Sequence, residues 1–551
     1  MNPKKYRAPQ IMDFPARTWP GKKISTAPEW CSVDLRDGNQ SLVTPLTPEQ
    51  KLEFFQFLVR VGFKEIEVGF PFASESEFNF VRTLIEKNLI PDDVTIQVLT
   101  QSREPVIRRT FESLRGAKKA TVHLYNATSP LFRDVVFGKS KEETTELAVF
   151  GAEMFAKIAA EYKAAGGCEE FSFEYSPECF SQTEPDFAIE VCNAVISRWE
   201  GYRTIINLPF TVESLTPNVH ADMIEYVCGK LINRKKITVS LHAHNDRGTA
   251  VAATELSLLA GADRVEGTLF GNGERTGNAD IITLAMNLYS QGIDPKLDFS
   301  NINELVEVYE GACMLPVHPR HPYAGELVFT AFSGSHQDAI RKAMTKRKPD
   351  DLWEIPYLPI DPADVGRGYE PIIRVNSQSG SSSAAYILET MYGIHLPKQM
   401  QRDFGPIVTA LSDKHAAEIP AEEIYALFKN TYEVNVPFKL FSRESYVQGR
   451  DSSSITCKIE DRGTIIKISG TGRGVIHAFC NALKNTYGFN IDVGHFNQHT
   501  LNVSEGAEAP AITYMEIIIN DKNYFGVGIS RSTTNASLKA VLSAANRWMA
   551  D

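Results

Sequence analysis

The sequence lacks three features, each of which would have pointed to a different class of protein. Its eight cysteines include no C-x-x-C pair, which argues against a zinc knuckle or a disulfide framework and favours a reducing compartment. It contains no run of about 18 apolar residues, so we expect no membrane-spanning helix. The net charge of −11 disfavours nucleic acid or an anionic membrane as partner, because both attract basic surfaces.

The N-terminal residues also lack the apolar core of a secretory signal, so we expect a cytoplasmic protein. With 551 residues, of which 43% are apolar and 23% charged, the chain has the composition of a packed globular protein and the length of more than one domain. Its partners are therefore expected to be small molecules or a second copy of itself.

Short apolar segments alternate with longer amphipathic segments in the first half of the chain. Thr47–Val61 predicts a helix with Thr47 as N-cap and proline at the first helical position. Eight segments have strand character: Trp30–Leu35, Glu65–Phe70, Thr95–Leu99, Thr121–Tyr125, Phe171–Tyr175, Thr204–Leu208, Ile237–His242 and Arg264–Leu269. Eight strands separated by helices over about 240 residues predict a closed (β/α)₈ barrel. A doubly wound open sheet is the alternative, but the glycine-rich phosphate motif it needs after an early strand is missing.

We divide the chain into an N-terminal extension (1–29), a catalytic barrel (30–325), a mainly helical linker region (326–435) and a C-terminal α/β domain (436–551). Within the last domain, Ser454–Ile468 and Ile512–Ile529 each predict two strands that lead through a glycine turn into a helix. The turn glycines are Gly472 and Gly474 in the first unit, and Gly526 and Gly528 in the second. Such glycines indicate either anion-binding helix N-termini or simply the turns of a dimerisation domain.

The clearest chemical motif is His242-Ala243-His244, at the end of the seventh predicted strand. Alternate residues of a strand face the same side, and barrel enzymes place their chemistry at the C-terminal strand ends. Asp37 follows the first strand and Asn278 the eighth, which are neighbours in a closed barrel. We expect these four residues to converge on a divalent metal, and their mixed nitrogen and oxygen donors suit Zn²⁺, Mn²⁺, Mg²⁺ or Fe²⁺. The alternative is a pair of surface histidines beside a polar turn.

Other polar residues at strand ends predict a ring around this ion. Arg36 would supply a fixed positive charge for an anionic oxygen, and the glycines around Asn272 would let the backbone approach a ligand. The remaining members of the ring are Glu67, His123, Ser176, Glu178 and Thr211. No serine or cysteine nucleophile with its own base is evident, so Lewis-acid polarisation with proton transfer is the expected chemistry.

These motifs resemble those of the acyl-CoA-dependent 2-keto acid condensing enzymes, and most closely the 2-isopropylmalate synthases of the longer bacterial form. The resemblance covers nearly the whole chain from about residue 5. Its motifs are Leu35–Gln40, Glu65–Pro71, Phe173–Glu178, Asn207–Pro209, His242–Asp246, Gly271–Asn278, Phe332–Asp338 and Tyr357–Pro362.

The resemblance implies a condensation of acetyl-CoA with 2-oxoisovalerate to 2-isopropylmalate and CoA, the first committed step of leucine biosynthesis. Asp37, His242, His244 and Asn278 would hold Mg²⁺, Mn²⁺ or Zn²⁺, with K⁺ as a candidate activator. Arg36 would stabilise the developing alkoxide. His123, Ser176 and Thr211 would position the keto acid, and Gly271, Asn272 and Gly273 would accommodate CoA.

The resemblance leaves two candidates for the base, Glu178 and His336. His336, with Tyr357 beside it, would reach the site from the partner subunit of a homodimer. The last domain would be regulatory and bind leucine, with Gly472, Gly474, Gly526 and Gly528 in its turns. Val475 stands where the family usually has proline, which leaves the strength of leucine inhibition open.

Four other activities use a similar scaffold. Homocitrate and citramalate synthases differ only in the keto acid they accept. A hydroxymethylglutaryl-CoA lyase cleaves the bond instead, but is shorter and has no C-terminal regulatory domain. A metal-dependent amidohydrolase also carries an H-x-H pair in a barrel, but on the first strand rather than the seventh.

Overall fold

The computed structural model describes residues 3–5, 12–165, 167–331, 333–368, 381–415, 419–450, 452–501 and 509–551. The chain forms two compact units, Met1–Phe329 with Ile360–Gly368, and Thr330–Pro359 with Tyr369–Asp551. The predicted linker region 326–435 is therefore divided between them. Ile360–Gly368 belongs to the first unit, where Arg367 donates to the backbone oxygens of Gly325 and Ala324 at 2.7 and 2.6 Å.

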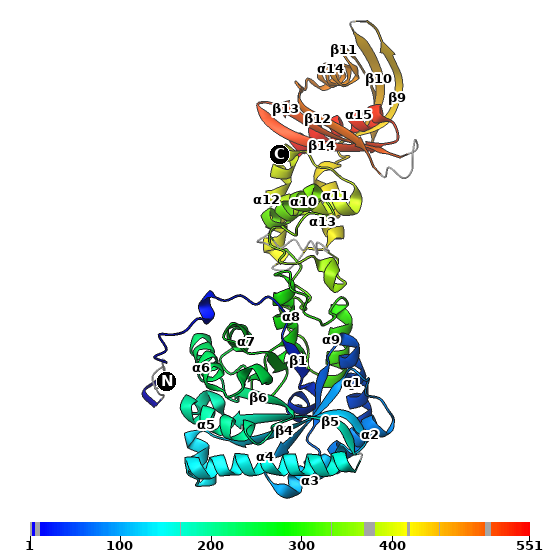
Figure 1. Ribbon diagram of the computed structural model, residues 1–551. Coiled ribbons are helices and arrows are strands. Elements are labelled where there is room, and N and C mark those ends of the chain that lie inside the picture. The colour runs from blue at the N-terminus through cyan, green and yellow to red at the C-terminus, as the bar shows by residue number, and fades with distance from the viewer. Residues whose placement is uncertain are drawn as a thin grey trace. The chain divides into compact units, whose positions relative to one another are not determined.

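The first unit is a closed barrel of parallel strands in sequential order, surrounded by helices (Figure 1). β1 pairs with both β2 and β8, which closes the sheet. This confirms the predicted (β/α)₈ barrel and all eight strand positions. The strands are β1 (Glu29–Ser32), β2 (Glu65–Gly69), β3 (Thr95–Gln101), β4 (Ala117–Ala127), β5 (Cys168–Glu178), β6 (Arg203–Phe210), β7 (Ile237–Ala243) and β8 (Arg264–Gly267).

The helix predicted over Thr47–Val61 is found at Pro48–Val61, with Thr47 as its N-cap. The Thr47 hydroxyl accepts the Gln50 N–H while the Gln50 side chain accepts the Thr47 N–H, a capping box that starts α1 where predicted. None of the helices in the described ranges combines the length and apolar character needed to cross a bilayer. The helices are α1 (Pro48–Val61), α2 (Glu75–Glu86), α3 (Glu104–Ser113), α4 (Lys141–Ala164), α5 (Pro185–Ile196), α6 (Pro217–Lys230), α7 (Ala250–Leu259), α8 (Ile281–Tyr289) and α9 (Ile302–Cys313).

The first strand is shorter than the predicted Trp30–Leu35, because residues Asp34–Gly38 form one turn of π-helix. The buried carboxylate of Asp34 accepts hydrogen bonds from the Ser32 hydroxyl at 2.8 Å and from the Leu269 N–H at 3.0 Å. The turn that carries Arg36 and Asp37 is thus fastened to the residues that follow β8. π-helical turns are rare and are often found at functional sites.

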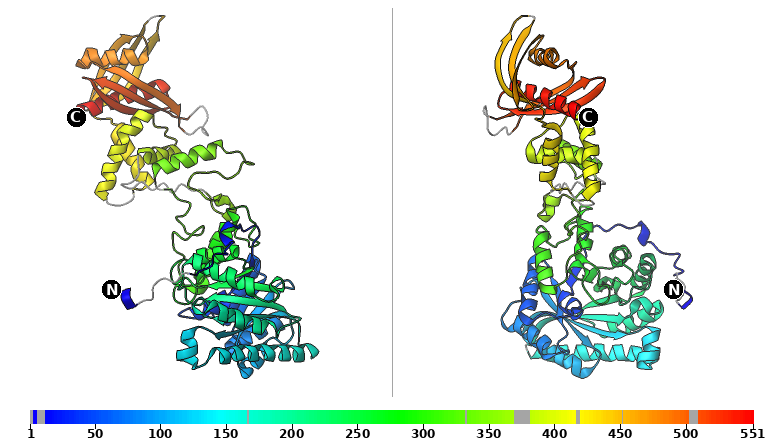
Figure 2. Two further views of the ribbon diagram at one scale, coloured as in Figure 1. Left: turned by 60° about the vertical axis from the view of Figure 1, so that its left-hand side comes forward. Right: turned by 180° about the vertical axis from the view of Figure 1, so that it is seen from behind.

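The second unit begins with helices and ends with two antiparallel sheets of three strands each (Figure 2). The strand orders are β11-β10-β9 and β12-β13-β14. The helices are α10 (Gly334–Lys346), α11 (Ser381–Tyr392), α12 (Lys398–His415), α13 (Ala421–Tyr432), α14 (Val475–Tyr487) and α15 (Thr533–Ala550). The strands are β9 (Phe438–Gln448), β10 (Ser453–Asp461), β11 (Thr464–Gly472), β12 (Asp492–Thr500), β13 (Ala511–Ile519) and β14 (Lys522–Ser530).

Each C-terminal repeat therefore has three strands before its helix, and the predicted ββα units were wrong by one strand. The missing strands, β9 and β12, lie at sheet edges and are mostly exposed. β12 is mostly polar in sequence, and β9 mixes apolar with polar residues and leaves most of them exposed, as expected of an edge strand with a solvated face. No apolar run marked them as strands.

β13, by contrast, is buried on both faces. Met515, Ile517 and Ile519 belong to a core shared with α14, α15 and the first sheet. Ile512 and Tyr514 point to the other side, into a core with α11, α12 and α13. Successive side chains of a strand alternate between its two faces. The second sheet therefore lies between the two cores of this unit and contributes side chains to both.

The glycines of the last domain are not the predicted turns. Gly472 ends β11 and Gly526 and Gly528 lie within β14, whereas only Gly474 occupies a helix start, as the N-cap of α14. A Cβ atom on Gly526 would lie 2.2 Å from the backbone oxygen of Ala540 in α15. The strand glycines thus allow close packing of a helix on a sheet, and their predicted part in leucine binding stays a prediction.

Replacement of Gly526 by alanine should destabilise the second unit by about 1–3 kcal/mol, because the added methyl overpacks the strand–helix contact. Calorimetry of the full chain would show a lower transition temperature for that unit. Gly474→Ala is the matched control, since its Cβ would meet no atom within 4 Å. Equal shifts for both variants would contradict the packing role.

Candidate active site and metal centre

The C-terminal strand ends surround a cavity of about 240 Å³. Its walls come from the turn after β1, from the ends of β3 to β7 and from the loop after β8. The lining residues are Arg36, Asp37, Gln40, Leu99, His123, Tyr125, Ser176, Glu178, Asn207, Pro209, Thr211, His242, His244, Glu274 and Arg275. Most of the polar residues predicted to ring the site therefore line one cavity.

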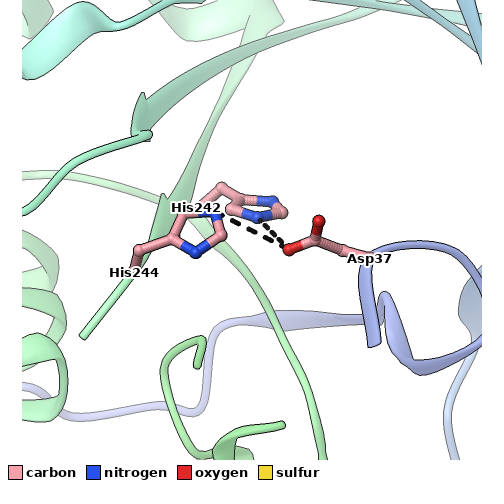
Figure 3. A group of neighbouring side chains, drawn as sticks. All are labelled: Asp37, His242 and His244. Carbon is pink, nitrogen blue, oxygen red and sulfur yellow. Dashed lines mark ion pairs between the residues drawn. The ribbon is translucent and has the colours of Figure 1, made fainter. Parts of the chain in front are cut away.

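Asp37, His242 and His244 point toward one another from two segments of the barrel (Figure 3). Asp37 Oδ2 lies 3.4 Å from His242 Nε2 and 3.7 Å from His244 Nε2. Donor atoms that share one divalent ion at about 2.0–2.2 Å lie roughly 3–3.6 Å apart. All three side chains are buried. The Asp37–His242 separation falls in the range for a shared ion and the Asp37–His244 separation lies just beyond it, so the group could hold a single divalent cation.

The charges around these residues favour a cation. Burial raises the pKa of Asp37, but Arg36, His242 and His244 outweigh burial and hold it well below its ordinary value. Burial lowers the pKa of His242, but Asp37 and Glu266 on either side of the ring raise it to about 9. Burial and the charge of His242 lower the pKa of His244 to about 4. The centre therefore offers an ionised carboxylate, and His244 offers a neutral imidazole.

The loop after β8 packs against this centre. Asn278 Nδ2 donates to Asp37 Oδ2 at 2.8 Å and to the backbone oxygen of Asn272 at 3.0 Å. It is the nitrogen, not the oxygen, of Asn278 that faces Asp37, and the buried Oδ1 has no hydrogen-bond partner in the described part of the chain. Asn278 is thus placed beside the centre, and its oxygen as a fourth ligand stays a prediction.

The three residues predicted to accommodate CoA lie in the same loop. Asn272 Nδ2 donates to the backbone oxygen of Gly38 at 3.1 Å, and Gly273 packs against Asn278. Gly271, with φ of 70°, begins the turn. These three residues support the metal-ligand turn and do not line the cavity, whereas Glu274 and Arg275 do. Their contact with CoA stays a prediction.

Arg36 lies between two carboxylates. Its Nε is 2.5 Å from Glu67 Oε2 and its Nη1 is 3.0 Å from Asp37 Oδ1. Burial alone would lower the pKa of Arg36, but Glu67 and Asp37 raise it above its ordinary value. A guanidinium held in this way is a fixed positive charge at the edge of the cavity.

His123 is hydrogen-bonded on both ring nitrogens. Nδ1 is 2.9 Å from Glu67 Oε1 and Nε2 is 2.7 Å from the Ser176 hydroxyl. Since a carboxylate only accepts, the ring hydrogen lies on Nδ1 and Nε2 accepts from Ser176. Asn207 Nδ2 also donates to Ser176, at 2.9 Å. The sequence analysis predicted His123 and Ser176 at the site but did not predict the hydrogen bond between them.

Thr211 and Glu178 both line the cavity. The Thr211 hydroxyl accepts the N–H of Cys179 at 2.9 Å. Cys179 has a left-handed backbone, with φ of 61°, which turns the chain sharply after Glu178. Burial raises the pKa of Glu178, partly offset by Arg36. A carboxylate with a raised pKa that lines the cavity is well suited to accept a proton.

His336 and Tyr357 belong to the second unit. Their rings stack with centroids 3.8 Å apart and planes at 21°. The sequence thus correctly predicted that the two residues lie side by side. Their contribution to a site at the barrel of a partner subunit stays a prediction.

Beneath the cavity lies a series of ion pairs, buried except at its far end, that the sequence analysis missed. His242 Nδ1 is 2.8 Å from Glu266, which pairs with Arg264 at 2.8 Å, and Arg264 pairs with Glu65 at 2.7 Å. Arg203 then joins Glu65 to Glu29, each at 2.5 Å. This series of ion pairs runs from the metal centre toward the N-terminal end of the barrel, and positive and negative groups alternate along it.

One further buried carboxylate belongs to this interior. Glu174 lies 3.3 Å from both Arg264 and His123, but neither of its oxygens makes a hydrogen bond within the described residues. Burial and the nearby Glu266 raise the pKa of Glu174 well above its ordinary value. Glu174 therefore holds its proton more tightly than an exposed carboxyl group does.

A signal for this network was present in the sequence. Polar residues alternate along strands such as Glu65-Ile66-Glu67 and Arg264-Val265-Glu266. Alternate positions of a barrel strand face its interior, so a period of two in charged residues predicts an internal ion-pair network.

A closed barrel whose C-terminal mouth brings together a carboxylate, two imidazoles and an arginine defines a class of metal-dependent barrel enzymes. Within that class, the HMGL-like family matches residues 27–308. The alpha-isopropylmalate synthase post-catalytic domain-like family matches residues 326–389, and the LeuA allosteric (dimerisation) domain matches 418–549.

Curated relatives extend this similarity over the whole chain. The 2-isopropylmalate synthase of Acetoanaerobium sticklandii is 54% identical, with 100% of this chain and 97% of the relative covered. That of Pseudomonas entomophila is 52% identical, with 99% and 97% covered. The chain belongs to the 2-isopropylmalate synthase family.

Among the residues of this ion-pair series, Arg264 should contribute most to the stability of the barrel. Arg264→Met would remove the guanidinium that Glu65 and Glu266 share, leaving Glu65 only Arg203 and Glu266 only His242 as an ionic partner, and should lower the free energy of unfolding by about 3–5 kcal/mol. Urea-induced unfolding followed by tryptophan fluorescence would measure the loss. Arg203→Met is the control, since its side chain is 34% exposed and its loss should cost only about 1 kcal/mol. Equal losses would argue against the network's role.

Proposed function

We propose that the chain condenses acetyl-CoA with 2-oxoisovalerate and hydrolyses the thioester, to give 2-isopropylmalate and CoA. The observation that carries the proposal is the convergence of Asp37, His242 and His244 beside Arg36, in a cavity at the barrel mouth. The similarity to 2-isopropylmalate synthases over the whole chain supports the same reaction.

A divalent metal fits the residues of this centre. Asp37, His242 and His244 would hold it, with Asn278 adjacent, and Mg²⁺, Mn²⁺ and Zn²⁺ all suit a mixed set of nitrogen and oxygen donors. When bound, such a cation supplies Lewis-acid polarisation of a keto oxygen. K⁺ as an activator belongs to the same proposal through the family resemblance alone.

The chain's own residues supply charge and proton transfer. Arg36 is oriented by Glu67 and Asp37 and lines the cavity, so its guanidinium can stabilise the oxygen on which negative charge develops. Glu178 lines the same cavity and can accept a proton from the methyl group of acetyl-CoA. The raised pKa of Glu178 brings its basicity closer to neutral pH, where general-base catalysis is most effective.

The cavity also favours a small branched substrate side chain. Leu99, Tyr125 and Pro209 contribute apolar surface to its wall, which suits an isopropyl group. A distal carboxylate, as in 2-oxoglutarate, would need a cation. Arg275 lines the cavity but pairs with Asp246 at 2.7 Å, and Arg36 is the group proposed to stabilise the keto oxygen. This contrast favours 2-oxoisovalerate over the substrate of a homocitrate synthase.

The C-terminal domain supports regulation and dimer formation. Its match to the LeuA allosteric (dimerisation) domain favours a homodimer in which leucine acts as feedback inhibitor. Under this proposal His336 and Tyr357 complete the active site of the partner subunit. We place the protein in the cytoplasm, since its substrates and product would be soluble metabolites.

Release of free thiol from acetyl-CoA should be fastest with 2-oxoisovalerate and much slower with pyruvate or 2-oxoglutarate. The activity should disappear when the divalent metal is removed with a chelator. Asp37→Ala and His244→Ala should each lower kcat/KM by at least ~10³-fold, because Lewis-acid stabilisation of the transition state is worth several kcal/mol. Repeating the assay with leucine tests the proposed inhibition.

Glu274→Gln provides a comparison in that assay, since Glu274 lines the cavity without belonging to the metal group. It should leave metal dependence unchanged. Full activity in a metal-free preparation, or a preference for pyruvate or 2-oxoglutarate, would overturn the proposed reaction.

The pH dependence of kcat/KM should identify the base. A carboxylate base must be ionised, so activity falls as the pH drops through its pKa, and burial should place that fall above pH 4.5 if Glu178 is the base. Glu178→Gln should lower kcat by roughly 10²–10⁴-fold and remove this acid limb. His336→Gln should retain the fall in activity at low pH. Loss of that fall in His336→Gln but not in Glu178→Gln would assign the base to His336.

A further inference from the structure

Glu266 is a fully buried carboxylate on β8 that touches a metal-ligand candidate from behind. Its Oε2 lies 2.8 Å from His242 Nδ1, while Nε2 on the opposite side of the ring faces Asp37. Because an ionised carboxylate only accepts hydrogen bonds, the ring hydrogen lies on Nδ1. When a cation takes the place of the hydrogen on Nε2, the lone pair of Nε2 would be directed toward the centre.

We propose that Glu266 is the positioning residue of His242, which fixes the orientation and tautomer of the imidazole and makes Nε2 a stronger metal ligand. The inference rests on the metal centre of the proposed function. A carboxylate behind a ligating imidazole increases the basicity of the ligand and often accounts for about 10–100-fold in metal affinity. Glu266 lines no part of the cavity and acts only through His242.

Glu266 is itself held by three strands. Its Oε1 accepts from Arg264 Nη1 at 2.8 Å and from Gln97 Nε2 at 3.1 Å. Its Oε2, which binds His242, also accepts from Asn207 Nδ2 at 3.2 Å. Arg264 shares β8 with Glu266, and Gln97 and Asn207 come from β3 and β6. With donors on both oxygens, the carboxylate cannot rotate away from the imidazole without breaking buried hydrogen bonds.

The two histidines of the centre differ in this respect. His244 Nδ1 is buried and has no hydrogen-bond partner among the described residues. The support from a carboxylate is therefore specific to His242. Glu174 offers a natural comparison, since it is equally buried and lies beside Arg264, but it has no contact with His242.

The test is the affinity of the metal-free full-length protein for Mn²⁺, followed by electron paramagnetic resonance, and for Zn²⁺, measured by competition with a fluorescent chelator. Glu266→Gln keeps the shape and removes the charge, and should weaken binding about 10-fold. Glu266→Ala removes the acceptor as well and should weaken it up to about 100-fold. Glu174→Gln is the matched control and should stay within about two-fold of wild type.

Glu266→Asp controls for misfolding of the other variants. It keeps the negative charge opposite Arg264, but its shorter side chain places the carboxylate farther from His242 Nδ1. It should also weaken metal binding. The rise in Tm on adding saturating Mn²⁺ gives a second readout for a less stable variant. Wild-type affinity in Glu266→Gln and Glu266→Asp would overturn the inference. Failure of the wild-type protein to bind either metal would instead overturn the proposed metal centre.

Discussion

The pairing of β1 with β8 is the contact on which the candidate site depends. Asp37 and His242 are separated by more than 200 positions in the chain, and only closure of the sheet places the turn after β1 beside the end of β7. The π-helical turn of Asp34–Gly38 is then fastened to the residue after β8 through the hydrogen bond from Leu269 to Asp34. Asp37, His242 and His244 therefore come together only because the barrel closes. Any change that disrupts the pairing of β1 with β8 would separate them.

Burial of charge is the second constraint. The barrel encloses Glu65, Glu67, Glu174 and Glu266, and an unpaired buried carboxylate is costly. Arg264 and Arg36 neutralise most of this charge, and burial together with Glu266 raises the pKa of Glu174. Ion pairs thus extend from the floor of the barrel to the rim, where the last of them orient the residues at the cavity. The same interactions that keep the interior stable also hold the polar groups of the site in place.

Much of the barrel and of the metal group could be predicted from sequence, because both are encoded by short local patterns. Eight apolar strands, the capping box at Thr47 and the His242-Ala243-His244 pair each lie within a few residues of chain. The errors occurred where the pattern was weak. The edge strands β9 and β12 have little apolar surface, and Gly526 and Gly528 gave a turn signal although they lie inside a strand against a helix.

The amino-acid sequence by itself determined which donors exist and which way each faces along its own strand, since side-chain direction follows from the local period of two. Tertiary structure alone decided which donors meet. It placed Glu266 behind His242 and Ser176 against His123, and directed the nitrogen of Asn278 rather than its oxygen toward Asp37. These contacts join different strands across the barrel, so their distances depend on how the sheet closes, which no single segment of the chain encodes.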